Sequence, residues 1–160
     1  MPNAVERHTQ RLRVICSAFL VSLGLYAGLV AALGGPVRPL LPQGEALMWG
    51  FAFLAAVNLV TIMPLYRVML AGPRRVFAVG QQPDRLLAAH LAAHVTAFAR
   101  LEAVALLGLV LFLLAGRQDW FAVFTAVAAL GMVTLWPRRA KVAALLAVPG
   151  TPPITQTSLS

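Results

Sequence analysis

The chain has 160 residues, of which 60% are hydrophobic and 11% are charged, and its mean hydropathy is +0.82. Soluble domains carry about 25% charged residues, and a globule this small cannot bury so much apolar surface. The composition therefore excludes a water-soluble enzyme. It also excludes a disordered chain, which requires low hydrophobicity. The remaining class is an integral membrane protein.

Four apolar segments are each long enough to span a membrane. A helix needs about 20 consecutive apolar residues to cross the ~30 Å hydrocarbon core of a bilayer. The segments are residues 14–33, 46–66, 95–115 and 120–136, the last with a tryptophan at each end. The first segment is too long for the apolar region of a cleaved signal peptide, so we expect it to be retained. The sequence predicts an all-α fold in which the four spans form an antiparallel transmembrane bundle.

The basic residues alternate between the two sides of these spans. Most of the 13 cations lie in the N-terminal segment, in the loop between the second and third spans, and in the tail, whereas the two opposite loops hold one each, Arg38 and Arg117. The positive-inside rule therefore predicts that both termini are cytoplasmic. The preference for Arg, Ala and Leu is typical of a GC-rich bacterial genome, so we expect a multi-pass protein of the bacterial inner membrane.

The predicted organisation has five segments. They are a basic cytoplasmic N-terminus (1–13), a first transmembrane hairpin (14–66), a cytoplasmic connector (67–94), a second transmembrane hairpin (95–136) and a cytoplasmic tail (137–160) that is basic and then disordered. Within the connector, Gly72-Pro73 and Gln81-Gln82-Pro83 predict turns. The pattern from Asp84 onward predicts an interfacial helix that leads into the third span, and a second interfacial helix is predicted over 138–148.

Glu102 is the most informative residue, because it lies about seven residues, or roughly 10 Å, inside the third span. A carboxylate at this depth costs a few kcal/mol unless it is paired, neutralised or hydrated. Two interpretations stay open: a proton or cation site, and a structural polar contact. Arg100 lies about 200° away around the helix and should not pair with Glu102. If the second and third spans are neighbours, Asn58 or Thr61 is the predicted hydrogen-bond partner.

Histidines and glycines supply further candidates. His90 and His94 share a helix face with metal-ligand spacing, but two ligands are too few, so we expect interfacial histidines and no bound metal. Gly24 and Gly28 form a Gly-x-x-x-Gly motif, which allows close approach of helices. We expect packing within the monomer there, with self-association as the alternative, and we expect Gly108 to be a packing position as well.

Two other groups of residues need partners. Arg74, Arg75, Arg138 and Arg139 border the spans on the predicted cytoplasmic side. Cations at that surface are attracted to anionic lipid headgroups by about 1 kcal/mol each, although these arginines also serve as plain topological determinants. Tyr26 lies nearly in the middle of the first span, where its hydroxyl requires a partner or a hydrated crevice.

The stretch Arg100-Leu-Glu-Ala-Val-Ala-Leu-Leu-Gly and the apolar run that follows it resemble the ion-carrying helix of rotary-ATPase proteolipid (c) subunits. In that family a carboxylate is likewise followed by an apolar, glycine-containing run, and Glu102 with Gly108 matches the spacing. The resemblance covers residues 100–114 and implies an ion-binding role for Glu102. The second hairpin is more similar to small bacterial four-span membrane proteins, which implies a fold and no particular activity.

The sequence shows no nucleophile–base pair and no metal-binding constellation, so we expect no enzymatic activity and no cofactor. We expect a small accessory or structural subunit that acts through helix–helix contacts. The alternative is a proton- or cation-linked carrier centred on Glu102. The expected partners are the lipid bilayer and either a second copy of the chain or another membrane subunit; nucleic acid is not expected.

Overall fold

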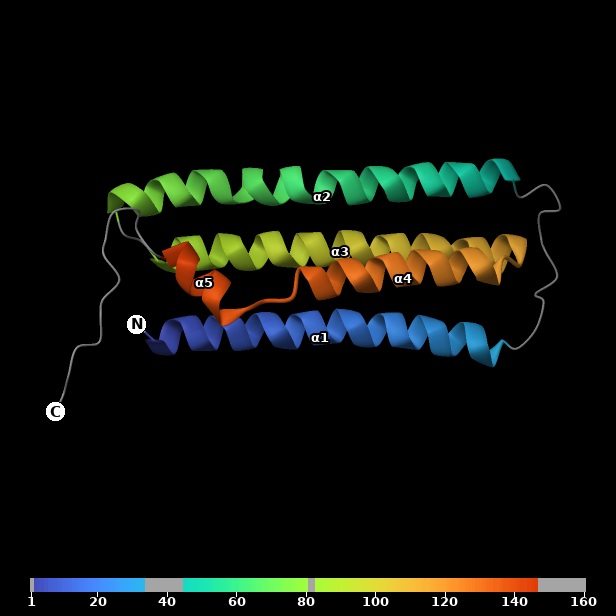
Figure 1. Cartoon of the computed structure of the whole chain (residues 1–160), viewed down its shortest axis with the longest axis horizontal. Helices are drawn as coiled ribbons and strands as arrows, with labels where there is room; N and C mark the ends of the chain where they lie inside the picture. Colours follow the sequence, from blue (N-terminus) through green and yellow to red (C-terminus); the bar gives the residue numbers. More distant parts are fainter. Residues whose placement is uncertain (1, 34–44, 81–82, 147–160) are drawn as a thin grey trace.

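The computed structural model describes residues 2–33, 45–80 and 83–146, and its regular structure is entirely α-helical. The helices are α1 (Pro2–Ala32), α2 (Glu45–Gly80), α3 (Pro83–Ala115), α4 (Gln118–Thr134) and α5 (Arg139–Leu146). Helices α1 to α4 lie side by side along the long axis, and α5 lies at the end of the molecule where the N-terminus is found (Figure 1). The all-α fold class is confirmed.

Three of these helices are long and apolar enough to cross a membrane, namely α1, α2 and α3. At 1.5 Å per residue, their 31, 36 and 33 residues extend about 46 to 54 Å, more than the ~30 Å hydrocarbon core. Helix α4 has 17 residues and is about 26 Å long. It counts as a fourth candidate span only together with α5, from which it is bent by 54°. The helices thus indicate a membrane protein with three clear candidate spans.

The predicted connector is mostly a continuation of α2 and α3. Helix α2 continues through Gly72-Pro73 to Gly80, so the turn predicted at this dipeptide is wrong. Proline removes one backbone hydrogen bond and crowds the preceding turn, but prolines do occur inside this helix, at Pro64 and Pro73, so the dipeptide alone does not end it. Residues 83–94 form the first part of α3, as predicted, and α5 occupies the position of the second interfacial helix. The predicted breaks and tail at residues 34–44, 81–82 and 147–160 lie outside the described residues.

Helix α3 is the most enclosed of the three candidate spans, since half of its most apolar part is buried, and it contacts α1, α2 and α4. Its buried side chains extend from Leu86 to Phe112. By contrast, α1 and α2 expose large apolar side chains, among them Val21, Phe53 and Val60. Contact of so much apolar surface with water would be unfavourable in free energy. Lipid or a partner helix is therefore expected to cover it.

Small residues bring α3 and α4 together. A Cβ atom added to Gly108 would lie 2.8 Å from Cβ of Phe124, and one added to Gly131 would lie 2.5 Å from Cδ2 of Leu101. Gly108 is therefore a packing position, as expected. The prediction that Gly24 and Gly28 pack within the chain is wrong, because a Cβ atom at either residue would meet nothing within 4 Å in the described structure. These two glycines lie on the exposed side of α1, away from the neighbouring helices.

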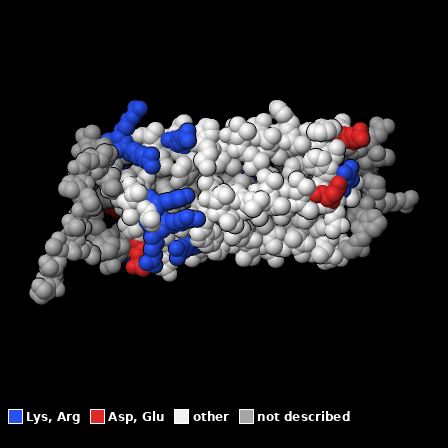
Figure 2. Space-filling view, viewed as in Figure 1, with Lys and Arg blue, Asp and Glu red and all other residues white. Residues whose placement is uncertain are grey.

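Charged side chains are concentrated at the two ends of the molecule. On the visible face, most Lys and Arg gather near the end that holds the N-terminus and α5, and the middle is free of charge (Figure 2). We call the end that holds the N-terminus and α5 the basic end. A broad uncharged zone between charged ends is the distribution expected of a protein embedded in a bilayer.

Candidate functional site

The Glu102 carboxylate accepts two hydrogen bonds from helix α1. The donors are Ser22 Oγ, 2.6 Å from Glu102 Oε1, and Tyr26 OH, 2.8 Å from the same oxygen. Ser22 and Tyr26 are four residues apart and so share one face of α1, and Glu102 projects from α3 toward that face. Tyr26 thereby obtains the partner that its hydroxyl requires in the apolar part of the chain.

Ser22 has a second acceptor within reach. Its Oγ lies 2.7 Å from the carbonyl oxygen of Phe19, and a hydroxyl group has only one proton to donate. The Ser22 hydroxyl is therefore shared between the Glu102 carboxylate and the backbone of its own helix.

The predicted pairing of Glu102 with Asn58 or Thr61 is wrong. Asn58 Nδ2 donates to the Leu54 carbonyl oxygen at 3.0 Å, and Thr61 Oγ1 donates to the Val57 carbonyl oxygen at 2.6 Å. Both side chains thus bond to the preceding turn of their own helix, which is common for short polar side chains in helices.

The separation of Arg100 from Glu102 is as expected. The Arg100 guanidinium extends to α2, where it donates to Thr61 Oγ1, whereas Glu102 points to α1. The angle of about 200° between the two residues around α3 places them against different helices. The carboxylate consequently has no ion-pair partner among the described residues.

A cluster of ring side chains lies at the basic end. His8 of α1 and His90 of α3 are both buried, and His8 Nε2 lies 3.1 Å from His90 Nδ1. His94 is also buried, and its Nδ1 lies 3.2 Å from Tyr66 OH of α2. His90 and His94 share a face of α3, as predicted, with ring centroids 4.4 Å apart. Within the described ranges, no three His, Cys, Asp or Glu residues are placed to hold a metal ion.

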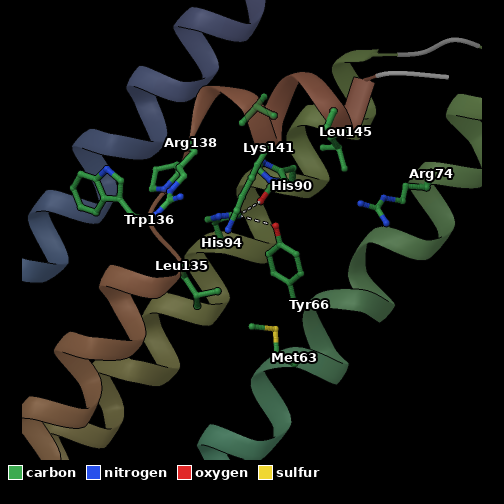
Figure 3. Close-up of a pocket in the computed structure, with 13 residues that line it drawn as sticks. Met63, Tyr66, Arg74, His90, His94, Leu135, Trp136, Arg138, Lys141 and Leu145 are labelled. Atoms are coloured by element: carbon green, nitrogen blue, oxygen red, sulfur yellow. Dashed lines mark hydrogen bonds between the residues drawn. The ribbon is translucent and has the colours of Figure 1, made fainter. Parts of the chain in front are cut away.

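A cavity of about 400 Å³ opens beside His90 and His94 (Figure 3). Its walls come from α2, from α3 and from the segment 135–145, which includes most of α5. Tyr66 and Arg74 of α2 extend toward the histidines from one side, and Arg138 and Lys141 border the cavity from the other. The remaining wall is mainly apolar.

The four predicted headgroup arginines separate into two kinds. Arg74 and Arg138 line the cavity, and Arg75 and Arg139 do not. Arg139 forms an exposed ion pair with Glu6, with Nη2 and Oε1 2.9 Å apart. Exposed pairs of this kind contribute about 0–1 kcal/mol, so this pair links α5 to α1 only weakly.

The turn between α3 and α4, at the opposite end, holds a second exposed ion pair. Arg117 Nη2 lies 2.6 Å from Asp119 Oδ2, and Arg117 Nε donates to Asp119 Oδ1 at 2.9 Å. The hydrogen bonds from Arg117 lower the pKa of Asp119 from 3.8 to about 2. Asp119 precedes the predicted fourth span and faces solvent, so the pair belongs to the surface.

Sequence reasoning missed several of the residues that form these two sites. Ser22, His8, Tyr66 and Lys141 carry no signal of their own, because their partners are far away along the chain. The separations reach 80 residues for Ser22 and Glu102, and 82 residues for His8 and His90. One usable signal was the spacing of Ser22 and Tyr26, which places two hydroxyl groups on one face of an otherwise apolar helix.

Comparison of the chain with protein-family models, with curated proteins and with solved structures gives no match. The similarity of residues 100–114 to rotary-ATPase proteolipids, and that of the second hairpin to small bacterial four-span proteins, therefore stay predictions from the sequence.

Proposed function

We propose that the chain is a multi-pass inner-membrane protein of four spans, with both termini in the cytoplasm, that works without catalysis as an accessory subunit. Three apolar helices of spanning length and the concentration of cations at the basic end support this arrangement. Tryptophans support α4 as the fourth span: Trp120 at its start contacts Trp49 of α2, with ring centroids 6.5 Å apart, and Trp136 follows its end. Tryptophan is enriched at membrane interfaces.

One observation carries the proposal of a non-catalytic role. The single carboxylate in the middle of the third predicted span, Glu102, is engaged by Ser22 and Tyr26 of another helix. Its hydrogen bonds hold α1 against α3, and hydrogen bonds between helices in a membrane contribute about 0.6–2 kcal/mol each. Glu102 in this role is a structural link in the bundle.

The exposed face of α1 is the surface that we propose for a partner helix. Gly24 and Gly28 lie there with open space above them, and Val21 and Leu25 beside them are exposed. Small residues flanked by apolar ones permit close packing of helices within a bilayer. The partner is a second copy of the chain or a helix of another membrane subunit.

A carrier centred on Glu102 is the second candidate, and a specific observation favours it. The nearest cation along α3, Arg100, extends to Thr61, so Glu102 has hydroxyl donors but no counter-ion in the described chain. Carboxyl groups without a counter-ion inside a membrane are typical of proton and cation sites.

Two substitutions of Glu102 separate the candidates. In the structural role, Glu102→Gln retains an acceptor for Ser22 and Tyr26 and should leave the free energy of unfolding nearly unchanged. Glu102→Leu leaves both hydroxyl groups without that acceptor and should lower it by about 1–4 kcal/mol for two lost contacts. The measurement is unfolding of the full chain in mixed micelles. Glu45→Leu, at the exposed start of α2, is the control.

Reaction with a hydrophobic carbodiimide completes the test. The structural role predicts no ion-dependent labelling of Glu102 and a clear stability difference between the Gln and Leu variants. Equal stability of these variants would contradict it. Selective labelling of Glu102 that a transported cation blocks would establish the carrier instead.

A further inference from the structure

The cations of the cavity have no partner within the described chain. Arg74, Arg138 and Lys141 line it, and their side chains form no hydrogen bond or ion pair with other described residues. No acidic residue is among the lining side chains. Three like charges around one concavity raise the local concentration of anions, because field lines converge in a hollow with low-dielectric walls.

The other wall of the cavity is apolar. Met63, Leu135 and Leu145 contribute to it, as does the buried Val142. A volume of about 400 Å³ lies within the range of small-molecule sites and exceeds what one inorganic anion requires. The lining therefore matches a ligand with a negative head and an apolar body.

The position of the cavity fits such a ligand. Tyr66 ends the second predicted span, His94 immediately precedes the third, and Trp136 ends the fourth. All three line the cavity, so it lies where the hydrocarbon core meets the headgroup layer. At that level a lipid phosphate is at the height of the arginines, and the first part of its acyl chain is at the height of the apolar wall.

We propose that this cavity binds an anionic amphiphile, with a phosphate headgroup between Arg74, Arg138 and Lys141 and the adjoining acyl chain against Met63, Leu135 and Leu145. Tyr66, His90 and His94 form the polar wall beside the headgroup (Figure 3). Guanidinium groups suit this task because they donate two hydrogen bonds to one phosphate. The site does not involve Glu102, so it does not depend on the role proposed for that residue, but it rests on the proposed four-span arrangement.

Trp136 lies at the edge of the cavity, with its indole ring directed toward α1 (Figure 3), and provides a probe of lipid at that edge. In a chain with Trp49→Phe and Trp120→Phe, Trp136 is the only tryptophan, and lipids with brominated acyl chains quench tryptophan on contact. We expect brominated phosphatidylglycerol to quench Trp136 at least twofold more than brominated phosphatidylcholine at equal mole fraction in vesicles. Native mass spectrometry of the unaltered chain with the same two lipids gives a second measurement that does not depend on the Phe substitutions.

A pair of matched variants tests the role of the cavity cations. Arg74→Gln/Arg138→Gln removes two cations from the cavity, whereas Arg67→Gln/Arg85→Gln removes two exposed cations of α2 and α3 outside it. Each cation near the membrane surface contributes about a fivefold gain in affinity for anionic lipid, so the first pair should bind phosphatidylglycerol at least tenfold more weakly. The second pair should retain most of the preference.

The outcomes are separable. Equal quenching by the two lipids in the chain with the cavity intact would overturn the proposal. Equal losses of phosphatidylglycerol binding in the two variant pairs would also overturn it, because they would show that general surface charge attracts the lipid. Inorganic phosphate distinguishes the two sources of the headgroup. If phosphate alone binds and displaces the lipid, the ligand is a soluble phosphate compound; if it does not, the ligand is the lipid.

Discussion

In the apolar middle of the molecule, the Glu102 carboxylate accepts hydrogen bonds from Ser22 and Tyr26 of the same chain. At the basic end, Arg74 and Lys141 border a cavity without any partner for their charges in the described structure. Both regions contain polar groups next to apolar walls. They differ in whether the partner comes from within the chain.

This difference reflects what surrounds each region. Hydrocarbon offers no hydrogen bonds, so a polar group at that depth must find its partners within the protein. At the interface, water and lipid headgroups can act as hydrogen-bond partners. Cations without a partner in the protein are therefore tolerated there and are available to a ligand. The Glu102 carboxyl group thus has partners within the chain, whereas the cavity cations have none among the described residues and are available to a ligand.

The largest expected effect concerns packing in the middle. Gly108→Val would place a side chain against Phe124 and the backbone of Phe121, so we expect a loss of about 1–3 kcal/mol in the free energy of unfolding. Gly50→Val adds the same side chain to an open face of α2, and its effect should stay within about 0.5 kcal/mol. Unfolding in mixed micelles measures both. Equal losses would show that the α3–α4 contact is not as tight as the structure indicates.

Substitution of the two tyrosines is expected to have a smaller effect on the free energy of unfolding. Tyr26→Phe removes a hydroxyl that bonds Glu102 inside the apolar region and should cost about 0.6–2 kcal/mol. Tyr66→Phe removes a hydroxyl that bonds His94 at the basic end, where water or a headgroup can replace it, so its cost should be lower. The same unfolding measurement applies. A larger loss for Tyr66→Phe would reverse the distinction between the two regions.

The smallest effect is expected at the exposed turn between α3 and α4. Because Arg117 lowers the pKa of Asp119 to about 2, the contribution of this pair is complete above pH 3.8 and is lost as the pH falls through about 2. Asp119→Asn should abolish this acid-dependent step and should lower stability at neutral pH by the same small amount that the step represents in the unaltered chain. Unfolding measured against pH for both chains provides the test, and an Asp119 carboxyl signal that titrates near 3.8 by NMR would contradict the ion pair.

Much of the helical framework could be predicted from hydropathy. The first expected span falls inside α1 except for its last residue, the second and third fall inside α2 and α3, and most of the fourth falls inside α4. The turn at Gly72-Pro73 could not be excluded locally, because a glycine–proline pair is typical of turns and yet lies inside α2. Likewise, the role of Gly108 could be predicted, whereas that of Gly24 could not, because the Gly-x-x-x-Gly pattern does not show which helix face meets a neighbour.

The amino-acid sequence alone determined that this protein is helical and membrane-associated, because length, hydropathy and charge distribution are local properties of each segment. It also determined that Glu102 and Arg100 face different directions, since that follows from the helical period. Only the tertiary structure decided that Glu102 meets Ser22 and Tyr26 instead of Asn58 or Thr61, and that Arg74 and Lys141 border one cavity. These contacts join residues far apart in the chain, and which helix neighbours which depends on the packing of whole helix faces.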